Sequence, residues 1–275
     1  MNSPDRPDSP DGPDGPSGRS FWEARLRRFG HTGWAEAATY LYDQRLRLKA
    51  VGDVLAARPM SPRQHLALDY GCGVGDFTRL LAGRFAQVVG FDVSAQIIGR
   101  ALELNPAPNI RYTAQIAEVF TDAAFDLILS ITVLQHVTND TDLQRLLDTM
   151  AAALAPGGAA LVLETFALRE QLAGHTRRRT VDGLVALFRN SGLRLTSNQA
   201  FYHPTEAPTP AFTRYRRQWR TRLLSRLAGW RVPGARQVLG RLAQQAAQHD
   251  TAYLDQAHSP TRLLVFERSP PVEHG

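Results

Sequence analysis

Three closely spaced glycines with an aspartate on either side form the part of this sequence whose residue types point most clearly to chemistry. The glycines are Gly71, Gly73 and Gly75; Asp69 precedes them by two positions, and Asp92 ends the next apolar run. Glycine permits a positive φ and lets a ligand approach the backbone without an intervening Cβ. A carboxylate beside such a turn can accept two hydrogen bonds from a diol. The pattern predicts a site for a nucleotide-like cofactor.

The elements that must position this turn are a strand before it and a helix after it. Residues 65–70 are short and mostly apolar, as in a buried parallel strand, and residues 77–81 carry apolar side chains at helical spacing. The start of a helix offers N–H groups that no helical carbonyl accepts. The ligand is therefore expected to lie on the turn.

The spacing of the glycines disfavours two common cofactor sites. The dinucleotide fingerprint G-x-G-x-x-G needs its third glycine at position 76, where this chain has Asp76. A P-loop needs Gly-Lys-Ser/Thr after the turn, whereas this chain continues with Asp76 and Phe77 after Gly75. What remains is an acid, a G-x-G-x-G turn and a second acid at the end of the following strand.

This arrangement resembles the class I S-adenosylmethionine-dependent methyltransferases, with a sequence texture similar to the ubiquinone-biosynthesis type. The resemblance extends from about Asp43 to Arg268, apart from one C-terminal insertion. It implies S-adenosyl-L-methionine as cofactor. It also implies that Asp69 organises the loop and the methionine amino group, and that Asp92 accepts both ribose hydroxyls. Residues 114–118 would contact the adenine, with an amide where many members carry aspartate. The cofactor-binding residues implied in this way are Arg47, Asp69, Gly71, Cys72, Gly73, Asp92, Val93, Gln115, Ile116, Ser130 and Ile131.

The rest of the chain predicts the other elements of such a fold. Strands are expected over residues 65–70, 87–92, 109–113, 125–131, 159–164, 193–196 and 261–268, alternating with helices. By the resemblance, the last strand lies antiparallel beside the fifth. The predicted fold is α/β, a doubly wound seven-stranded Rossmann-like sheet with an antiparallel last strand, an N-terminal helical cap and a C-terminal helical insertion.

Composition divides the chain into four regions. Residues 1–18 are rich in Pro, Asp and Gly, contain no apolar segment, and predict a disordered tail rather than a signal peptide. Residues 19–60 predict a helical cap. Residues 61–202 with 259–270 predict the cofactor-binding core, and residues 203–258 an arginine-rich helical insertion that acts as a lid.

The helical cap contains three candidate site residues. Arg47 falls where the ubiquinone-type enzymes use an arginine for the methionine carboxylate, a group that a guanidinium fork suits. The alternative, left equally open, is an arginine on a solvated helix face. His31 and Trp34 are candidates to line the acceptor pocket, although aromatic residues at this density more often pack a cap onto a core. Gln135, after the fourth strand, is a further pocket candidate.

The insertion between the last two strands combines arginine with aromatic and aliphatic side chains. It reads as a basic amphipathic helical segment, most clearly over residues 214–241. A lid with a solvated face ranks first among the interpretations. An anionic acceptor, or contact with a membrane surface that holds a lipid-linked acceptor, ranks second, and RNA third.

Bulk properties favour a soluble enzyme of the cytoplasm. The chain has 275 residues, a formal net charge of +6 and one cysteine. The single cysteine excludes an intrachain disulfide and a cysteine-rich metal site, and no metal is predicted. No apolar run approaches the roughly 20 residues that span a bilayer, so no transmembrane segment is expected.

The segment after the fourth strand narrows the choice of acceptor. Residues 130–133 lack the Asp/Asn-Pro-Pro-aromatic element that nucleobase amino-methyltransferases of DNA and RNA generally use. Methylation of a cytosine carbon needs a nucleophilic cysteine, and Cys72 sits in the cofactor loop instead. DNA is therefore excluded as a partner, RNA is disfavoured, and a small-molecule acceptor remains.

The predicted reaction is an O-, N- or C-methylation by in-line displacement. Positioning supplies most of the acceleration, so a general base is optional. His136 is the candidate catalytic base, and the alternative is that it only packs at a helix start. Two other functions stay open: a non-catalytic cofactor-binding or protein-interaction module of the same fold, and a methyltransferase for an anionic lipid-linked or RNA acceptor.

Overall fold

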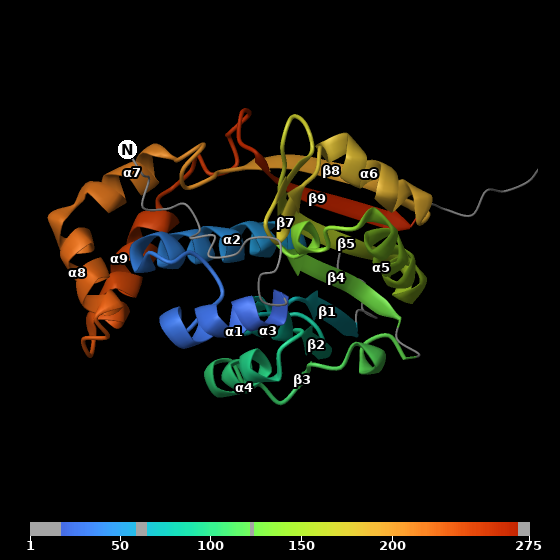
Figure 1. Cartoon of the computed structure of the whole chain (residues 1–275), viewed down its shortest axis with the longest axis horizontal. Coiled ribbons are helices and arrows are strands. Elements are labelled where there is room, and N and C mark those ends of the chain that lie inside the picture. Colours follow the sequence, from blue (N-terminus) through green and yellow to red (C-terminus); the bar gives the residue numbers. More distant parts are fainter. Residues whose placement is uncertain (1–17, 59–64, 122–123, 269–275) are drawn as a thin grey trace, which may run out of the picture. The chain divides into compact units, whose positions relative to one another are not determined.

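The computed structural model describes residues 18–58, 65–121 and 124–268, which form two compact units (Figure 1). The sheet unit contains residues 18–23, 65–199 and 261–268. The helical unit contains residues 24–58 and 200–260. The tail predicted at residues 1–18 lies outside the described residues except for Gly18.

The sheet unit is built on one seven-stranded sheet in the order β3-β2-β1-β4-β5-β9-β8 (Figure 1). Strands β1 to β5 pair in parallel, and β9 runs antiparallel to β5. The predicted doubly wound sheet with its antiparallel last strand is thus confirmed. The strands of this sheet are β1 (Leu66–Tyr70), β2 (Gln87–Phe91), β3 (Ile110–Thr113), β4 (Phe125–Ile131), β5 (Leu154–Thr165), β8 (Leu193–Phe201) and β9 (Thr261–Arg268).

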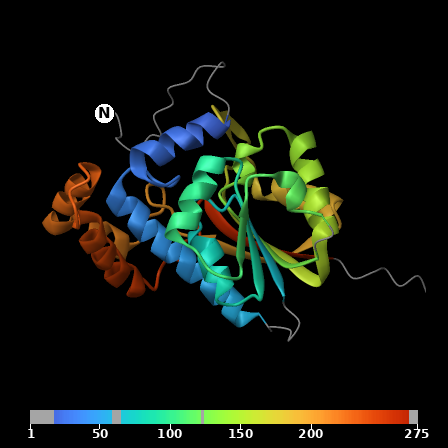
Figure 2. The ribbon, with the colours of Figure 1, turned by 90° about the horizontal axis from the view of Figure 1, so that it is seen from below.

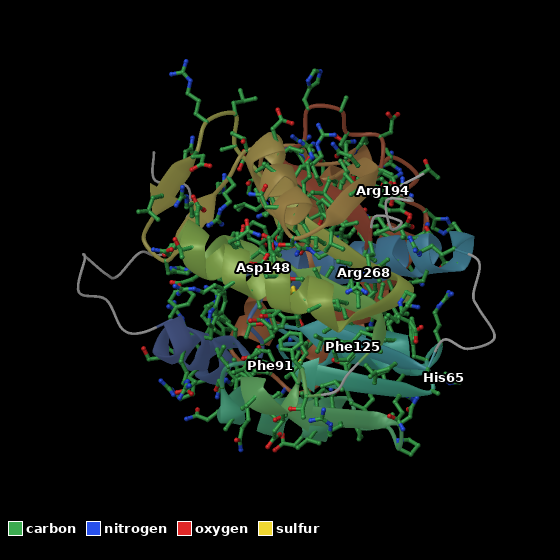
Figure 3. The ribbon with its side chains drawn as sticks, turned by 90° about the vertical axis from the view of Figure 1, so that its right-hand side faces the viewer. His65, Phe91, Phe125, Asp148, Arg194 and Arg268 are labelled. Atoms are coloured by element: carbon green, nitrogen blue, oxygen red, sulfur yellow. The ribbon has the colours of Figure 1, made fainter. Side chains whose placement is uncertain are left out.

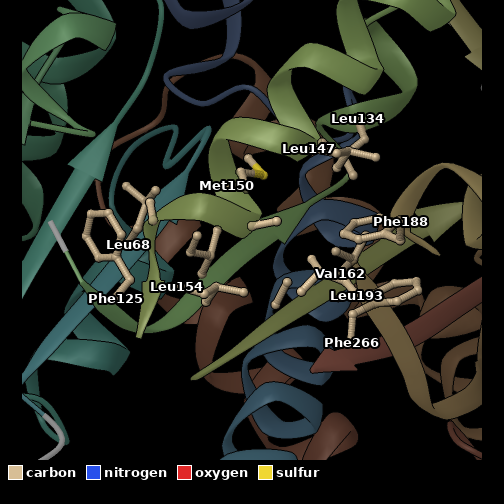
Figure 4. Close-up of a cluster of buried hydrophobic side chains, with 14 of the residues drawn as sticks. Leu68, Phe125, Leu134, Leu147, Met150, Leu154, Val162, Phe188, Leu193 and Phe266 are labelled. Atoms are coloured by element: carbon tan, nitrogen blue, oxygen red, sulfur yellow. The ribbon is translucent and has the colours of Figure 1, made fainter. Parts of the chain in front are cut away.

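Alternating side chains give this sheet two faces. On one face, Leu68, Val162 and Phe266 pack with residues of α5 (Asp140–Ala153) and α6 (Val181–Asn190) in a single buried cluster (Figure 4). Ile128 belongs to the same cluster. Figure 2 shows the ribbon of the sheet and its helices from below. On the other face, α3 (Asp76–Ala82) and α4 (Ala95–Leu104) pack against β1 to β3. Because Asp69 points to that second face, its carboxyl group lies under α3.

Side-chain caps and polar ties fix the ends of these helices. Ser94 Oγ accepts from Ile97 N at the start of α4, and Thr180 Oγ1 accepts from Gly183 N at the start of α6. Figure 3 shows Asp148 on α5, where its carboxylate accepts a 2.7 Å hydrogen bond from Ser191 Oγ. The end of α6 is therefore tied to α5.

The helical unit joins the predicted cap and the predicted insertion. Tyr42 on α2 and Thr209 before α7 both donate to Asp250, so one buried carboxylate links segments far apart in sequence. None of the helices described is long and apolar enough to cross a membrane. The helices of this unit are α2 (Ala37–Ala57), α7 (Pro210–Arg217), α8 (Trp219–Gly229) and α9 (Ala235–Gln248), with residues 24–29 of α1 (Gly18–Phe29).

Three parts of the chain's β-sheet structure differ from the sequence expectation. Strand β8 continues to Phe201, five residues beyond its expected end at position 196. Strand β5 begins at Leu154, five residues earlier than expected, with a register irregularity opposite Phe125 and Leu127. A short hairpin of β6 (Gln171–Ala173) and β7 (Thr176–Arg178) was not predicted at all. Most of its residues are polar and none is buried, so no alternating apolar pattern marks it in the sequence.

Candidate functional site

The glycine turn lies between β1 and α3 in the left-handed backbone region that its glycines allow. Gly71, Gly73 and Gly75 have φ values of +79°, +53° and +87°. The N–H groups of Gly71 and Cys72 both donate to the carbonyl oxygen of Phe91, each at 2.8 Å. The turn is therefore held at the end of β2. Burial raises the pKa of the Cys72 thiol, which argues against a role of this cysteine as a nucleophile.

Neighbouring side chains leave no room for a Cβ at two of these positions. A Cβ on Gly71 would lie 2.3 Å from Cγ2 of Val133, and a Cβ on Gly75 would lie 2.4 Å from the hydroxyl of Tyr112. Close packing and positive φ both require glycine here. The sequence signal and the geometry therefore agree.

Asp92 follows β2 and holds the turn from the other side. Its Oδ2 accepts from Gly73 N and its Oδ1 from Ser94 N, both at 3.2 Å. Burial raises the pKa of Asp92 to about 6. Because each oxygen keeps a second lone pair, the carboxylate can accept two further hydrogen bonds from a ligand diol.

A residue of α1 contacts this edge of the site. Ser94 Oγ donates to Glu23 Oε1 at 2.8 Å, and Glu23 belongs to the part of α1 that lies in the sheet unit. No local pattern predicts this pairing, because the two residues are 71 positions apart. It brings the first turns of α1 to the loop after β2.

Asp69 is buried beneath α3 and has one side-chain partner. Thr78 Oγ1 donates to its Oδ2 at 2.6 Å. Burial raises the pKa of Asp69 to about 7, and the nearby Asp92 raises it further while Thr78 opposes the shift. Two buried carboxyl groups beside one glycine turn favour a ligand that carries positive charge.

Exposed aliphatic side chains follow β2 and β3. Val93 is 44% and Ile116 46% exposed, which is high for such residues and suits contact with a flat apolar ring. Gln115 lies between β3 and the short 3₁₀ helix η1 (Ile116–Glu118); its side chain is exposed, and its N–H donates to Thr113 Oγ1. Ser130, near the end of β4, is buried with no hydrogen-bond partner for its hydroxyl among the described residues, and Ile131 beside it is half-buried.

The segment after β4 is held by an acid that the sequence analysis missed. Glu164, buried near the end of β5, accepts from Val133 N at 2.8 Å and from Leu134 N at 2.7 Å through the same Oε1. Thr132 just before them has a φ of +55°, unusual for a residue with a branched Cβ. The carboxylate thus holds a strained turn that carries Val133 against Gly71.

A buried arginine of the segment after β7 holds the same stretch from the opposite side. Arg179 Nη2 donates to Val137 O at 2.7 Å, and its Nε donates to Asp140 Oδ1 at 2.9 Å. Arg177 on β7 adds a hydrogen bond to Thr138 O at 3.0 Å. The β6–β7 hairpin is therefore fixed to the short 3₁₀ helix η2 (Leu134–His136) that follows β4.

His136 lies among aromatic rings contributed by α1 and by the β6–β7 hairpin. Its ring stacks on the His175 ring, with 5.2 Å between the ring centroids. It meets the Trp22 ring in an edge-to-face contact, with 4.8 Å between the centroids. His136 Nδ1 is 3.3 Å from the carbonyl oxygen of His175. A carbonyl only accepts, so this contact places the proton on Nδ1 and leaves a lone pair on Nε2.

Burial, followed by the neighbouring His175, lowers the pKa of His136 to about 4. The imidazole is therefore neutral near pH 7 and able to accept a proton at Nε2. Gln135 Nε2 lies 3.5 Å from that nitrogen. The predicted pair Gln135 and His136 thus lies together in the sheet unit.

The other three predicted residues lie in the helical unit. Arg47 Nε is 2.7 Å from Asp43 Oδ2, and Trp34 Nε1 donates to the same oxygen at 3.0 Å. His31 is buried with its ring stacked 3.4 Å from that of Tyr40, and burial lowers its pKa to about 3. The roles predicted for Arg47, Trp34 and His31 toward cofactor and acceptor stay predictions.

The raised pKa of Asp69 predicts a pH-dependent stability. A carboxyl group whose folded pKa is raised stabilises fully below its ordinary pKa, and that contribution is lost as the pH rises through about 7. His31 and His136 act in the opposite direction below about pH 6.5, because burial lowers their pKa. A comparison with Asp69→Asn isolates the carboxyl group.

Between about pH 5 and 7, the unliganded wild type should lose about 1 kcal/mol of unfolding free energy per pH unit relative to Asp69→Asn. Urea unfolding of both proteins across this range measures the difference. Parallel curves for the two proteins would contradict the raised pKa of Asp69.

The comparisons with known proteins agree with this geometry. Residues 67–158, which run from β1 into β5 and include the glycine turn and Asp92, match a family described as a methyltransferase domain. The matched residues also include the segment after β4 that carries Gln135 and His136, so the family match covers this part of the candidate site. The residues that the structure describes contain no cluster of His, Cys, Asp or Glu that could hold a metal ion.

Curated relatives match part of this chain over part of their own length. A trans-aconitate 2-methyltransferase of Variovorax paradoxus is 36% identical over 118 residues, 42% of this chain and 44% of the relative. A ubiquinone biosynthesis O-methyltransferase of Rhizobium rhizogenes is 36% identical over 115 residues, 40% of this chain and 44% of the relative. The matches therefore span less than half of these proteins.

Solved structures share the fold at low sequence identity. Phosphoethanolamine N-methyltransferase 2 of Haemonchus contortus, in complex with S-adenosyl-L-methionine, has a TM-score of 0.61 at 17% identity, over 94% of this chain and 61% of that chain. Magnesium protoporphyrin IX methyltransferase of Synechocystis has a TM-score of 0.55 at 16% identity, over 91% of this chain and 95% of that chain. The likeness at these identities concerns the fold alone.

Proposed function

We propose that this protein is an S-adenosylmethionine-dependent methyltransferase that acts on a small-molecule acceptor. The observation that carries the proposal is the Asp92 carboxylate, buried at the glycine turn and anchored by Gly73 N and Ser94 N. That anchoring leaves both oxygens able to accept from a ribose diol. The curated relatives, named as small-molecule methyltransferases, support the same activity.

The residues around the turn fit the other parts of this cofactor. Val93 and Ile116 offer exposed aliphatic surface for the two faces of the adenine. Asp69 offers a buried carboxylate near the turn for the cationic amino group. Gly71 and Gly73 present backbone without side chains along the path between the two acids.

When bound, S-adenosylmethionine supplies a methyl group on a sulfonium, which an acceptor oxygen, nitrogen or carbon attacks in line. The chain's contribution is to orient the acceptor and to take up its proton. His136 Nε2 carries the lone pair for that proton, because Nδ1–H is directed to the carbonyl of His175. Trp22 and His175 pack on the imidazole and limit its motion.

An acceptor that loses a proton on methylation suits this arrangement best. A hydroxyl or amine would hand its proton to Nε2, which is neutral above about pH 5 given the lowered pKa of His136. The aromatic rings around His136 favour an acceptor with apolar surface beside the reacting group. The predicted cytoplasmic location, the exclusion of DNA and the low rank given to an RNA acceptor belong to this proposal.

The deciding experiment is transfer of a radiolabelled methyl group from S-adenosylmethionine into an extract of the source organism. The extract is fractionated into small molecules, lipids, nucleic acids and protein, with the Asp92→Ala variant as the negative control. Label in the small-molecule fraction supports the proposal. Label in nucleic acid or protein overturns the acceptor class, and absence of label with intact cofactor binding points to a non-catalytic module.

The variant His136→Gln tests the proton acceptor. Without the imidazole lone pair, kcat should fall about 100-fold, the lower end of what a general base contributes. Affinity for S-adenosylmethionine should stay unchanged, because no contact of Asp69 or Asp92 involves this ring. Steady-state rates and calorimetry measure the two quantities, and an unchanged kcat would assign His136 to packing only.

The matched control for this variant is His65→Gln. His65 is an exposed histidine of the same unit, and its backbone N–H, not its ring, donates to Asp126. Its side chain has no part in the proposed chemistry, so both kcat and cofactor affinity should match the wild type. A drop in kcat for His65→Gln as well would indicate a general effect on the fold.

A further inference from the structure

One face of α8 exposes large apolar side chains that lie in a single stripe. Trp219, Leu223 and Trp230 are 68%, 49% and 75% exposed, respectively. Trp219 and Leu223 are four residues apart on α8, and Trp230 is the residue that caps its C-terminus, seven positions after Leu223. At helical spacing these three positions fall within one narrow arc. Thr221, on the opposite side, is buried within the helical unit. The stripe is therefore the outer face of a helix that is anchored on its inner face.

Arginines border this stripe on both sides. Arg222 and Arg226 lie at its edge on one side and Arg220 lies on the other, and all three are exposed. The Arg220 guanidinium packs over the Trp219 ring at 5.5 Å. The guanidinium groups thus surround an apolar centre, with their alkyl stems available to lie along it.

The positive charge of this region is not neutralised within the part of the chain that is described. No Asp or Glu occurs between Glu206 and Asp250, a stretch that contains nine arginines. Arg216 pairs with Glu36, and two others donate to backbone carbonyls of the α1 region. The arginines that form neither a salt bridge nor a side-chain hydrogen bond with a described residue are Arg214, Arg217, Arg220, Arg222, Arg226 and Arg241.

We propose that this face of α8, defined by Trp219, Leu223 and Trp230 with their flanking arginines, docks on the surface of an anionic lipid bilayer. Tryptophan prefers the headgroup level of a membrane, and arginine at that depth meets lipid phosphates. An interfacial helix needs one apolar arc bordered by basic residues, and α8 has both. The inference does not depend on the methyltransferase activity.

A nucleic acid fits the same surface less well. Aromatic residues that stack on bases work with a positively charged groove that follows the nucleic-acid backbone. Here Trp219 on α8 and Trp230 at its C-cap are exposed together with the aliphatic Leu223. Leucine gains little from contact with phosphate and gains more from the acyl boundary of a bilayer. Charge and apolar surface together therefore favour lipid.

The test is co-sedimentation of the full chain with vesicles of two compositions. Vesicles of phosphatidylcholine with about one third phosphatidylglycerol should bind the protein, pure phosphatidylcholine vesicles should not, and binding should weaken as salt is raised. The double variant Trp219→Ala/Trp230→Ala should bind at least tenfold more weakly, because it removes most of the apolar centre. Arg222→Gln/Arg226→Gln should bind about 30-fold more weakly.

Matched controls carry the same changes on the sheet unit. Leu168→Ala/Leu172→Ala removes two exposed aliphatic side chains, and Arg169→Gln/Arg189→Gln removes two exposed arginines. Both controls should bind the anionic vesicles like wild type, and thermal unfolding checks that every variant is folded. Equal binding by the α8 variants and their controls overturns the proposal.

Two further measurements test the other two molecules that could dock on this face of α8, an RNA and a second copy of the chain. Fluorescence anisotropy with labelled polyuridylic acid tests RNA, and sedimentation velocity tests self-association of the chain. Binding to the polynucleotide that exceeds binding to anionic vesicles, and that the tryptophan variant loses, overturns the proposal in favour of RNA. Self-association that the same variant abolishes overturns it in favour of a second copy.

Discussion

The Asp92→Ala variant is expected to bind S-adenosylmethionine several hundred-fold more weakly than the wild type. Two charge-assisted hydrogen bonds to the ribose are lost, and such bonds contribute about 1.5–3 kcal/mol each. The substitution also removes the acceptor for Gly73 N and Ser94 N, which lie 3.2 Å from the two carboxylate oxygens. Loss of these contacts loosens the glycine turn at the point where the cofactor is proposed to lie. Isothermal titration calorimetry measures the affinity.

Two further variants show whether a loss of cofactor affinity in Asp92→Ala comes from the carboxylate of Asp92 itself. Asp92→Asn keeps the shape and one acceptor oxygen but removes the charge, so its affinity should lie between those of wild type and Asp92→Ala. Asp142→Ala removes an exposed carboxylate from the first turn of α5 and should bind like wild type. Unchanged affinity in Asp92→Ala would remove the ribose assignment and, with it, the main support for the proposed function.

The parts of the site that the sequence could predict are those fixed by local chemistry. A G-x-G-x-G turn with an acid at each end needs only a short stretch of chain to be recognised, because positive φ and the absence of a Cβ demand glycine at particular positions. The structure places Gly71, Gly73 and Gly75 in that backbone region. The strand spacing on either side follows from apolar runs of ordinary length.

The parts that it could not predict depend on contacts between distant segments. Glu164 reads as the end of an apolar strand, yet it accepts from two N–H groups some thirty residues earlier. Arg179 looks like one of many arginines, yet it is buried and ties the segment after β4 to the chain after β7. Arginine is so frequent in this chain that no signal separates a buried one from a solvated one.

The aromatic residues of the predicted cap also show that contacts between distant segments could not be predicted from the sequence. Trp22 is part of a region predicted as a cap, and the structure places its ring 4.8 Å from that of His136 in the sheet unit. His31 and Trp34, which looked equally suitable by residue type, make their described contacts in the helical unit. Residue type and helical texture do not distinguish these aromatic residues, because the boundary between the two units falls within α1, between Glu23 and Ala24.

The Gly71→Ala variant is expected to lose about 3 kcal/mol of unfolding free energy. A non-glycine residue at the φ of +79° costs about 1–2 kcal/mol, and inserting a methyl group into a packed site costs about 1–3 kcal/mol. The new Cβ would lie 2.3 Å from Cγ2 of Val133. Relief of that overlap must move either the turn or the segment after β4. Urea unfolding measures the loss, and calorimetry should show weakened binding of S-adenosylmethionine.

Comparison with two further variants separates the causes of this loss. Gly99→Ala in α4 adds the same methyl group at a helical position with no atom within 4 Å, so it should stabilise the chain by up to about 1 kcal/mol. Adding Val133→Ala to Gly71→Ala should recover the unfolding free energy lost through the steric overlap, but not the part lost through the strained backbone. A double-mutant cycle measures this coupling. Strictly additive effects would show that Gly71 and Val133 do not press on each other. The turn would then be free to move independently of the segment that carries His136.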